Sequence, residues 1–104
     1  MRYPMTLFAL TIVAFTATAQ TEPETIAAEA GCGGCHQMEQ ALTGPSWQDI
    51  ADRYRGEDGA SETLQKRMRS GAQGSWGDTP MMPVTKEQLT DDELAAVIDW
   101  ILQQ

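Results

Sequence analysis

Cys32-Gly33-Gly34-Cys35-His36 is the stretch of sequence that decides the fold. The spacing Cys-x-x-Cys-His is typical of covalent attachment of a c-type haem. Two residues between the thiols span about one helical turn, which suits two thioether bonds to vinyl groups on one edge of a porphyrin. The histidine that follows can bind the iron as an axial ligand. The motif therefore predicts one haem c, bound covalently through Cys32 and Cys35 and ligated by His36.

Two other uses of a cysteine pair compete with haem attachment. A Cys32–Cys35 disulfide would suit a thioredoxin-like redox protein, but that class is expected near a βαβ pattern, and no strand-like run follows residue 19. A structural zinc site needs four ligands, and this chain offers two cysteines and one histidine. The adjacent histidine, the export segment described next and the helical character of the chain favour haem attachment over both.

The first 19 residues read as a cleaved signal peptide. One positive charge, Arg2, precedes a run of 14 apolar or small residues, 6–19, which ends in Ala17-Thr18-Ala19. An uncleaved membrane anchor would need roughly 20 apolar residues. We therefore expect cleavage after Ala19, export to the periplasm, and one mature domain over residues 20–104 with no membrane span.

Charge and size restrict the function of this mature domain. Loss of Arg2 leaves six basic against 15 acidic residues, a net charge of −9, which disfavours nucleic acid as a partner. We expect docking on neutral or positive protein surfaces, with a rate that falls as salt rises if the partner is basic. A domain of 85 residues has a small core, and a covalent haem at its centre would stabilise it.

The hydrophobic periodicity predicts an all-α fold of about four short helices. The first is expected over residues 23–35, the second over 47–54 after an N-cap at Ser46, and the third over 60–70 with a C-terminal glycine, Gly71. The fourth begins at Thr90, where Thr90-Asp91-Asp92-Glu93 forms a capping box. Residues 72–86 form a long irregular segment, and a loop of that length in so small a domain is usually functional.

The second axial ligand is expected to be a methionine, because the chain has no second histidine. Four of the six methionines are unsuited: two leave with the signal peptide, one is too close in sequence to His36, and one lies in the predicted core (Met1, Met5, Met38 and Met68). Met81 and Met82 remain, between Pro80 and Pro83, which would stiffen the segment. The residues alone leave the choice between these two open.

Taken together, these motifs resemble a known family, the short single-haem class I cytochromes c of bacteria. The resemblance covers residues 22–104 and is carried by several segments in order: Gly31-Cys32-x-x-Cys35-His36, Gly44-Pro45, Arg67-x-x-x-Gly71-x-x-Gly74-x-Trp76-Gly77, Pro80-Met81, and the amphipathic last helix with Trp100. It implies the class I cytochrome c fold, with the helices wrapped round one covalent haem.

The resemblance also implies roles for individual residues. Pro45 would accept a hydrogen bond from Nδ1 of His36, and Trp76 and Arg67 would bind a haem propionate. The ligand would be Met81, five residues after the tryptophan. Met82 stands where a proline is more usual in the family, so it remains the alternative ligand.

The predicted function is outer-sphere electron transfer by a monomeric periplasmic carrier, not an enzyme. With both axial positions filled, the iron would cycle between Fe(II) and Fe(III), and redox partners would dock transiently at the exposed haem edge. One alternative is a haem subunit fixed to a periplasmic dehydrogenase or oxidase. Another is a haem enzyme or gas sensor with an open iron site, although the chain has no distal histidine to support peroxide cleavage.

Overall fold

The computed structural model describes residues 12–14 and 21–104. In this part of the chain, four α-helices and one 3-10 turn follow in the order α1, η1, α2, α3, α4, and the only β-type pairs are two isolated bridges. The cleavage point predicted after Ala19, and most of the predicted signal peptide, lie outside the described residues. Among the described helices, none combines the length and apolar character that a membrane crossing requires.

The first helix is shorter than its sequence pattern predicts. Helix α1 covers Pro23–Glu29, and a separate 3-10 turn, η1, covers Cys32–Gly34. The prediction of one helix over residues 23–35 was therefore wrong. Gly31 between the two segments has a φ of 89°, a left-handed conformation that ends the α-helix and turns the chain toward the cysteines.

Helices α2 (Trp47–Tyr54) and α3 (Ala60–Ser70) have the predicted bounds. The Ser46 side chain caps α2 by accepting a hydrogen bond from the Asp49 N–H at 3.0 Å. The apolar face predicted for α2 is buried, and it comprises Trp47, Ile50, Ala51 and Tyr54. Helix α3 likewise buries its apolar positions, Ala60, Leu64 and Met68.

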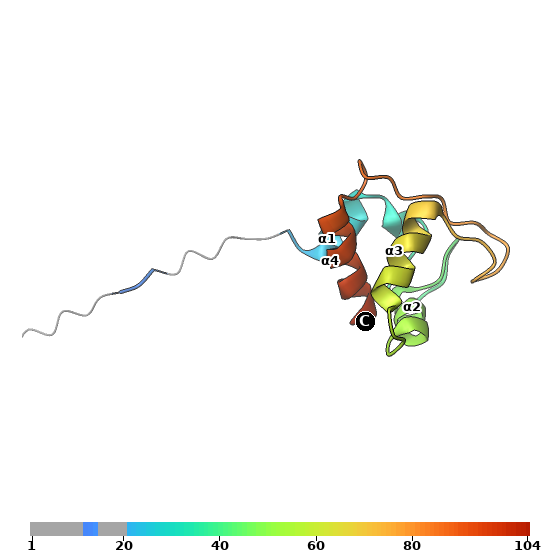
Figure 1. Ribbon diagram of the computed structural model, residues 1–104, viewed down its shortest axis with the longest axis horizontal. Helices are drawn as coiled ribbons and strands as arrows, with labels where there is room; N and C mark the ends of the chain where they lie inside the picture. Colours follow the sequence, from blue (N-terminus) through green and yellow to red (C-terminus); the bar gives the residue numbers. More distant parts are fainter. Residues whose placement is uncertain (1–11, 15–20) are drawn as a thin grey trace, which may run out of the picture.

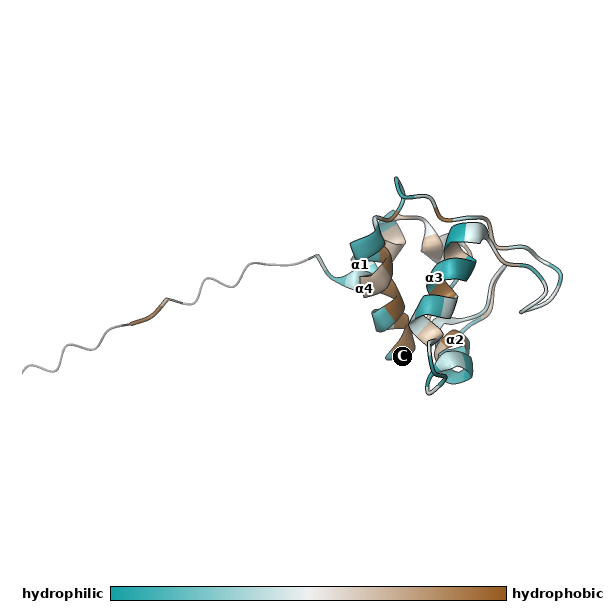
Figure 2. Cartoon of the chain, viewed as in Figure 1, coloured by the Kyte–Doolittle hydropathy of each residue, from teal (hydrophilic) through white to brown (hydrophobic). Residues whose placement is uncertain are grey.

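Helix α4 (Asp91–Leu102) is the centre of the core. It packs against α1, α2 and α3, and Figure 1 shows it alongside α1. Figure 2 shows that α4 is largely hydrophobic, whereas the side of α3 toward the viewer is hydrophilic. The four inward residues of α4 are almost fully buried: Leu94, Val97, Ile98 and Ile101. The predicted capping box is confirmed, since Thr90 and Glu93 exchange hydrogen bonds of 3.0 and 3.2 Å.

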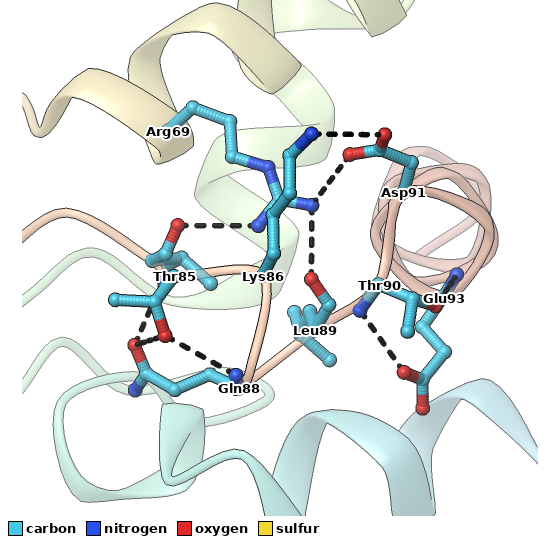
Figure 3. Close-up of polar contacts among 9 residues, drawn as sticks. Arg69, Thr85, Lys86, Gln88, Leu89, Thr90, Asp91 and Glu93 are labelled. Carbon is cyan, nitrogen blue, oxygen red and sulfur yellow. Dashed lines mark hydrogen bonds and ion pairs between the residues drawn. The ribbon is translucent and has the colours of Figure 1, made fainter.

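Arg69 ties the end of the long loop to the helices on either side of it (Figure 3). Its guanidinium donates from α3 to the carbonyls of Val84 and Leu89 at 3.2 and 2.9 Å. It also pairs with Asp91 at 2.9 Å, and Lys86 lies 3.6 Å from the same carboxylate. The hydrogen bond from Arg69, followed by the charge of Lys86, lowers the pKa of Asp91. These contacts fix where the loop joins α4, and so constrain the residues that precede it.

Candidate haem site

The two cysteines lie on one tight turn at the edge of a cleft. The backbone N–H groups of Cys35 and His36 both donate to the carbonyl of Cys32, at 3.2 and 3.0 Å. Both thiols are free and line the cleft, with Cys32 half-buried and Cys35 exposed. Burial raises the pKa of the Cys32 thiol. The turn thus presents both sulfur atoms to the same cleft.

The imidazole of His36 is buried and held in one orientation. Its Nδ1 lies 2.7 Å from the carbonyl oxygen of Pro45, which can only accept, so Nδ1 carries the proton. Nε2 makes no hydrogen bond within the described part of the chain. An imidazole that is held through Nδ1 and has a free Nε2 is an arrangement that can bind a metal ion.

Gly44 leaves the space that this ring occupies. A Cβ atom at residue 44 would lie 2.5 Å from Cε1 of His36, which is closer than real Cβ contacts come. The backbone N–H of Gly44 donates to the carbonyl of Cys35 at 2.9 Å, which holds the loop against the cysteine turn. Gly44 precedes Pro45 in the sequence motif, and the structure shows that a side chain at residue 44 would collide with the His36 ring.

The two candidate methionines differ in exposure. Met81 forms an antiparallel bridge with Ala72, with hydrogen bonds of 2.7 and 3.1 Å, and its side chain is half-buried against the core. Met82 is 74% exposed. Neighbouring residues of an extended segment point to opposite sides, so one thioether faces inward while the next faces water. Both residues border the cleft, and Met81 has the inward position.

Arg67 and Trp76 both line the cleft. The Arg67 guanidinium donates to the hydroxyl of Tyr54 and, at 3.1 Å, to the hydroxyl of Ser75. Trp76 is 42% exposed, and the guanidinium of Arg53 lies 4.7 Å from the centre of its ring. The structure therefore brings these two predicted residues to one cleft, where Arg67 bonds the residue that precedes Trp76.

Three residues that contact Arg67 or Trp76 were not among the predicted site residues: Arg53, Tyr54 and Ser75. Arg53 also donates to the carbonyl of Ser75 at 2.6 Å, which anchors the loop beside Trp76. Only Tyr54 carried a usable signal, because a tyrosine on a buried helix face usually needs a partner for its hydroxyl. The other two meet through a contact between residues 22 positions apart, which the local sequence does not encode.

The cleft has a volume of about 270 Å³ and is lined mainly by apolar groups. Among the residues that the structure describes, no aspartate or glutamate lines it, and Arg67 is its only lysine or arginine. An apolar slot suits a flat hydrophobic ring, and a single partly buried cation suits a carboxylate. Together with the paired thiols, the free Nε2 and the inward thioether, this lining fits a haem. Its main members are Cys32, Cys35, His36, Pro45, Trp47, Ile50, Tyr54, Leu64, Arg67, Met68, Trp76, Met81, Val84 and Ile101.

Comparisons with known proteins agree with this geometry. The family model described as "Cytochrome c" matches residues 21–104. Cytochrome c2 of Rubrivivax gelatinosus is 42% identical over 81 residues, which are 78% of this chain and 95% of the relative. Cytochrome c-551 of Pseudomonas aeruginosa is 35% identical over 83 residues, 80% of this chain and 77% of that protein.

Solved structures show the same fold. The crystal structure of cytochrome c552 of Nitrosomonas europaea superposes with a TM-score of 0.70 at 35% identity, and covers 76% of this chain and 95% of its own. The predicted all-α class I architecture is therefore confirmed. The chain belongs to the cytochrome c family: it is a class I c-type cytochrome with one covalent haem c, for which Cys32 and Cys35 have the required spacing.

Proposed function

We propose that this cytochrome is a periplasmic electron carrier whose haem has His36 and Met81 as axial ligands. The observation that carries the proposal is the arrangement round one apolar cleft, in which an imidazole with a free Nε2 and an inward-facing thioether both border the same space. When bound, the haem supplies an iron that accepts and releases one electron. The residues of the chain hold it, exclude water from it and set its potential.

His36 and Met81 have complementary roles in this proposal. The hydrogen bond from Nδ1 to Pro45 fixes the imidazole and makes Nε2 a more basic ligand. A thioether as the second ligand raises the reduction potential relative to a second imidazole. The bridge between Met81 and Ala72 would keep this soft ligand in place through the redox cycle. With both axial positions taken, no substrate would reach the iron.

Arg67 and Trp76 would hold a haem propionate. A carboxylate in an apolar slot is costly without a partner, and the Arg67 guanidinium is the cation that lines this cleft. The hydroxyls of Tyr54 and Ser75 already orient that guanidinium. The indole of Trp76, at the rim, would donate a further hydrogen bond.

The proposal extends to export and docking. Residues 1–19 would be removed as a signal peptide, and residues 20–104 would form the mature monomer in the periplasm. Redox partners would dock at the haem edge near the cysteines, where Cys35 is exposed. No carboxylate of residues 21–104 lines the cleft, so the acidic groups that would attract a basic partner lie on the surrounding surface. Electron transfer with a basic partner should slow as salt rises, and an unchanged rate would argue against electrostatic attraction.

The test is an optical spectrum of the purified holoprotein, oxidised and reduced, with carbon monoxide added to the reduced form. A c-type reduced spectrum, a far-red methionine–iron band when oxidised, and no response to carbon monoxide are the expected results. Rapid uptake of carbon monoxide would indicate an open iron site and favour a haem enzyme or gas sensor. Tight co-purification with a larger enzyme would favour a fixed subunit.

A matched pair of variants tests the ligand. Met81→Leu should abolish the far-red band, whereas Met82→Leu, which removes the adjacent exposed thioether, should leave the band intact. The reverse pattern would assign the iron to Met82. Because leucine conserves most of the volume of methionine, both variants should keep the fold.

A further inference from the structure

We infer that Trp47 is a positioning residue for the His36 imidazole and sets part of the haem reduction potential, an inference that rests on the proposed function. The two ring centres lie 4.7 Å apart and the ring planes meet at 26°, which is a stacked arrangement. Both side chains are buried, with 9% of His36 and 8% of Trp47 exposed. The indole therefore covers one face of the ring that holds the iron.

The backbone ties this indole to the ligand. The N–H of Trp47 donates to the carbonyl of Gln37 at 2.8 Å, and the N–H of Gln48 donates to the carbonyl of Met38 at 3.1 Å. These two bonds join the first turn of α2 to the residues that directly follow His36. The Trp100 ring of α4 also meets the indole edge-on, with 5.6 Å between the two ring centres. The two backbone bonds thus fix the start of the helix that carries Trp47 against the ligand loop.

Three contacts together fix the rotation of the imidazole about its Cβ–Cγ bond. The Pro45 carbonyl accepts a hydrogen bond from Nδ1, Gly44 lies against the Cε1 edge, and Trp47 covers a face. The direction of the imidazole plane decides how the ligand overlaps with the iron orbitals. That overlap is visible as the spread of the g-values in the electron paramagnetic resonance (EPR) spectrum of the ferric protein. Trp47 should therefore leave a spectroscopic signature that an ordinary core residue would not.

The stacked indole also has an electrostatic consequence. The face of an indole is negative and attracts positive charge, more strongly than the face of a phenyl ring. An imidazole ligand bears more positive charge opposite an oxidised iron than opposite a reduced one. Trp47 should therefore stabilise the ferric form relative to the ferrous form, and lower the reduction potential. Removal of the indole should raise it.

The experiment compares the holoprotein with Trp47→Phe, Trp47→Leu and, as a matched control, Trp100→Phe. The control changes the aromatic neighbour of Trp47 and leaves the contact with His36 in place. Midpoint potential by spectroelectrochemistry, ferric EPR spectra and thermal unfolding are measured for all four proteins. Trp47→Leu should raise the potential and change the g-value spread, Trp47→Phe should shift the potential less in the same direction, and Trp100→Phe should lower stability only.

The inference is overturned if Trp47→Leu and Trp100→Phe lower stability alike while the potential and the EPR spectrum stay at the wild-type values. If Trp47→Leu fails to retain haem, Trp47→Phe decides the question, together with Gly44→Ala, which pushes on the same imidazole. Gly44→Ala should change the g-value spread with Trp47 intact. A wild-type spectrum without histidine–methionine ligation would instead refute the proposed function, before any variant is compared.

Discussion

The Gly71→Ala substitution tests how the chain holds Met81. Gly71 ends α3 with a φ of 80° and a ψ of 159°, a conformation that is essentially restricted to glycine. A Cβ atom there would lie 2.9 Å from the carbonyl oxygen of Met81 and 3.2 Å from Cδ of Pro83. The same carbonyl accepts the hydrogen bond from Ala72 that forms half of the bridge. One added methyl group therefore strains the backbone and pushes on the residue proposed as the ligand.

The expected loss of stability is the sum of the backbone strain and the loss of the bridge between Ala72 and Met81. Backbone strain in this region costs about 1–3 kcal/mol. Loss of the two bridge hydrogen bonds between Ala72 and Met81 adds about 1 kcal/mol each. We therefore expect the free energy of unfolding to fall by about 3–5 kcal/mol, a large fraction of the total for a small domain.

The assay is denaturant unfolding of the ferric holoprotein, with the far-red band recorded before denaturant is added. Gly56→Ala is the matched control, because Gly56 has a φ of 87° but an added Cβ would meet nothing within 4 Å. It should cost only about 1–2 kcal/mol of backbone strain and leave the band intact. If Gly71→Ala is no more destabilising than this control, and its band is unchanged, the proposed packing of residue 71 against the Met81 segment is wrong.

Four further predictions concern the core, a helix cap, the propionate site and acid stability. Ile98→Ala should lower the free energy of unfolding by about 2–5 kcal/mol in denaturant titrations, because this side chain is fully buried, and a loss near zero would mean that the core relaxes round it. Thr90→Ala should lower the free energy of unfolding by about 1 kcal/mol in the same assay, because it removes the cap of α4, whereas Thr90→Ser keeps the capping hydroxyl and should keep the stability. Arg67→Gln should lower the midpoint potential, since an unpaired carboxylate favours the ferric iron, and Arg67→Lys should lower it less. Hydrogen bonds lower the pKa values of Asp91 and Glu93, so their contribution to stability is complete above the ordinary carboxyl pKa values of about 4 and is lost in the acid range below them, as pH falls through the lowered values. Unfolding midpoints measured across that range should fall less steeply in Arg69→Met, and an unchanged slope would contradict the pairing with Asp91.

Much of the architecture could be predicted because its determinants are local. The bounds of α2 and α3 follow from an apolar stripe and flanking cap residues, and the start of α4 follows from a capping box. The prediction failed at α1, where small and acidic residues run without a break into the cysteine motif. There, the left-handed conformation of Gly31 ended the helix. A glycine can lie within a helix or end it, so the sequence around Gly31 did not decide between a continuous and an interrupted helix.

The candidate site also has one part that the sequence predicted and another that only the structure decided. Cys32, Cys35 and His36 are adjacent in sequence, so their spacing alone predicts a covalent haem with one axial ligand. The residues left Met81 and Met82 equivalent, since both follow Pro80 and precede Pro83. Their difference in exposure comes from the bridge to Ala72, which sets the face that each residue presents.

The amino-acid sequence by itself determined the cofactor, the helical class and the order of the elements, because each depends on residues within a few positions of one another. Only the tertiary structure decided what surrounds the predicted ligands: the stack of Trp47 on His36, the space at Gly44, and the contact of Tyr54 with Arg67. The last two partners lie 13 positions apart on different helices. Their distance depends on how α2 and α3 pack, and packing is a property of the whole chain.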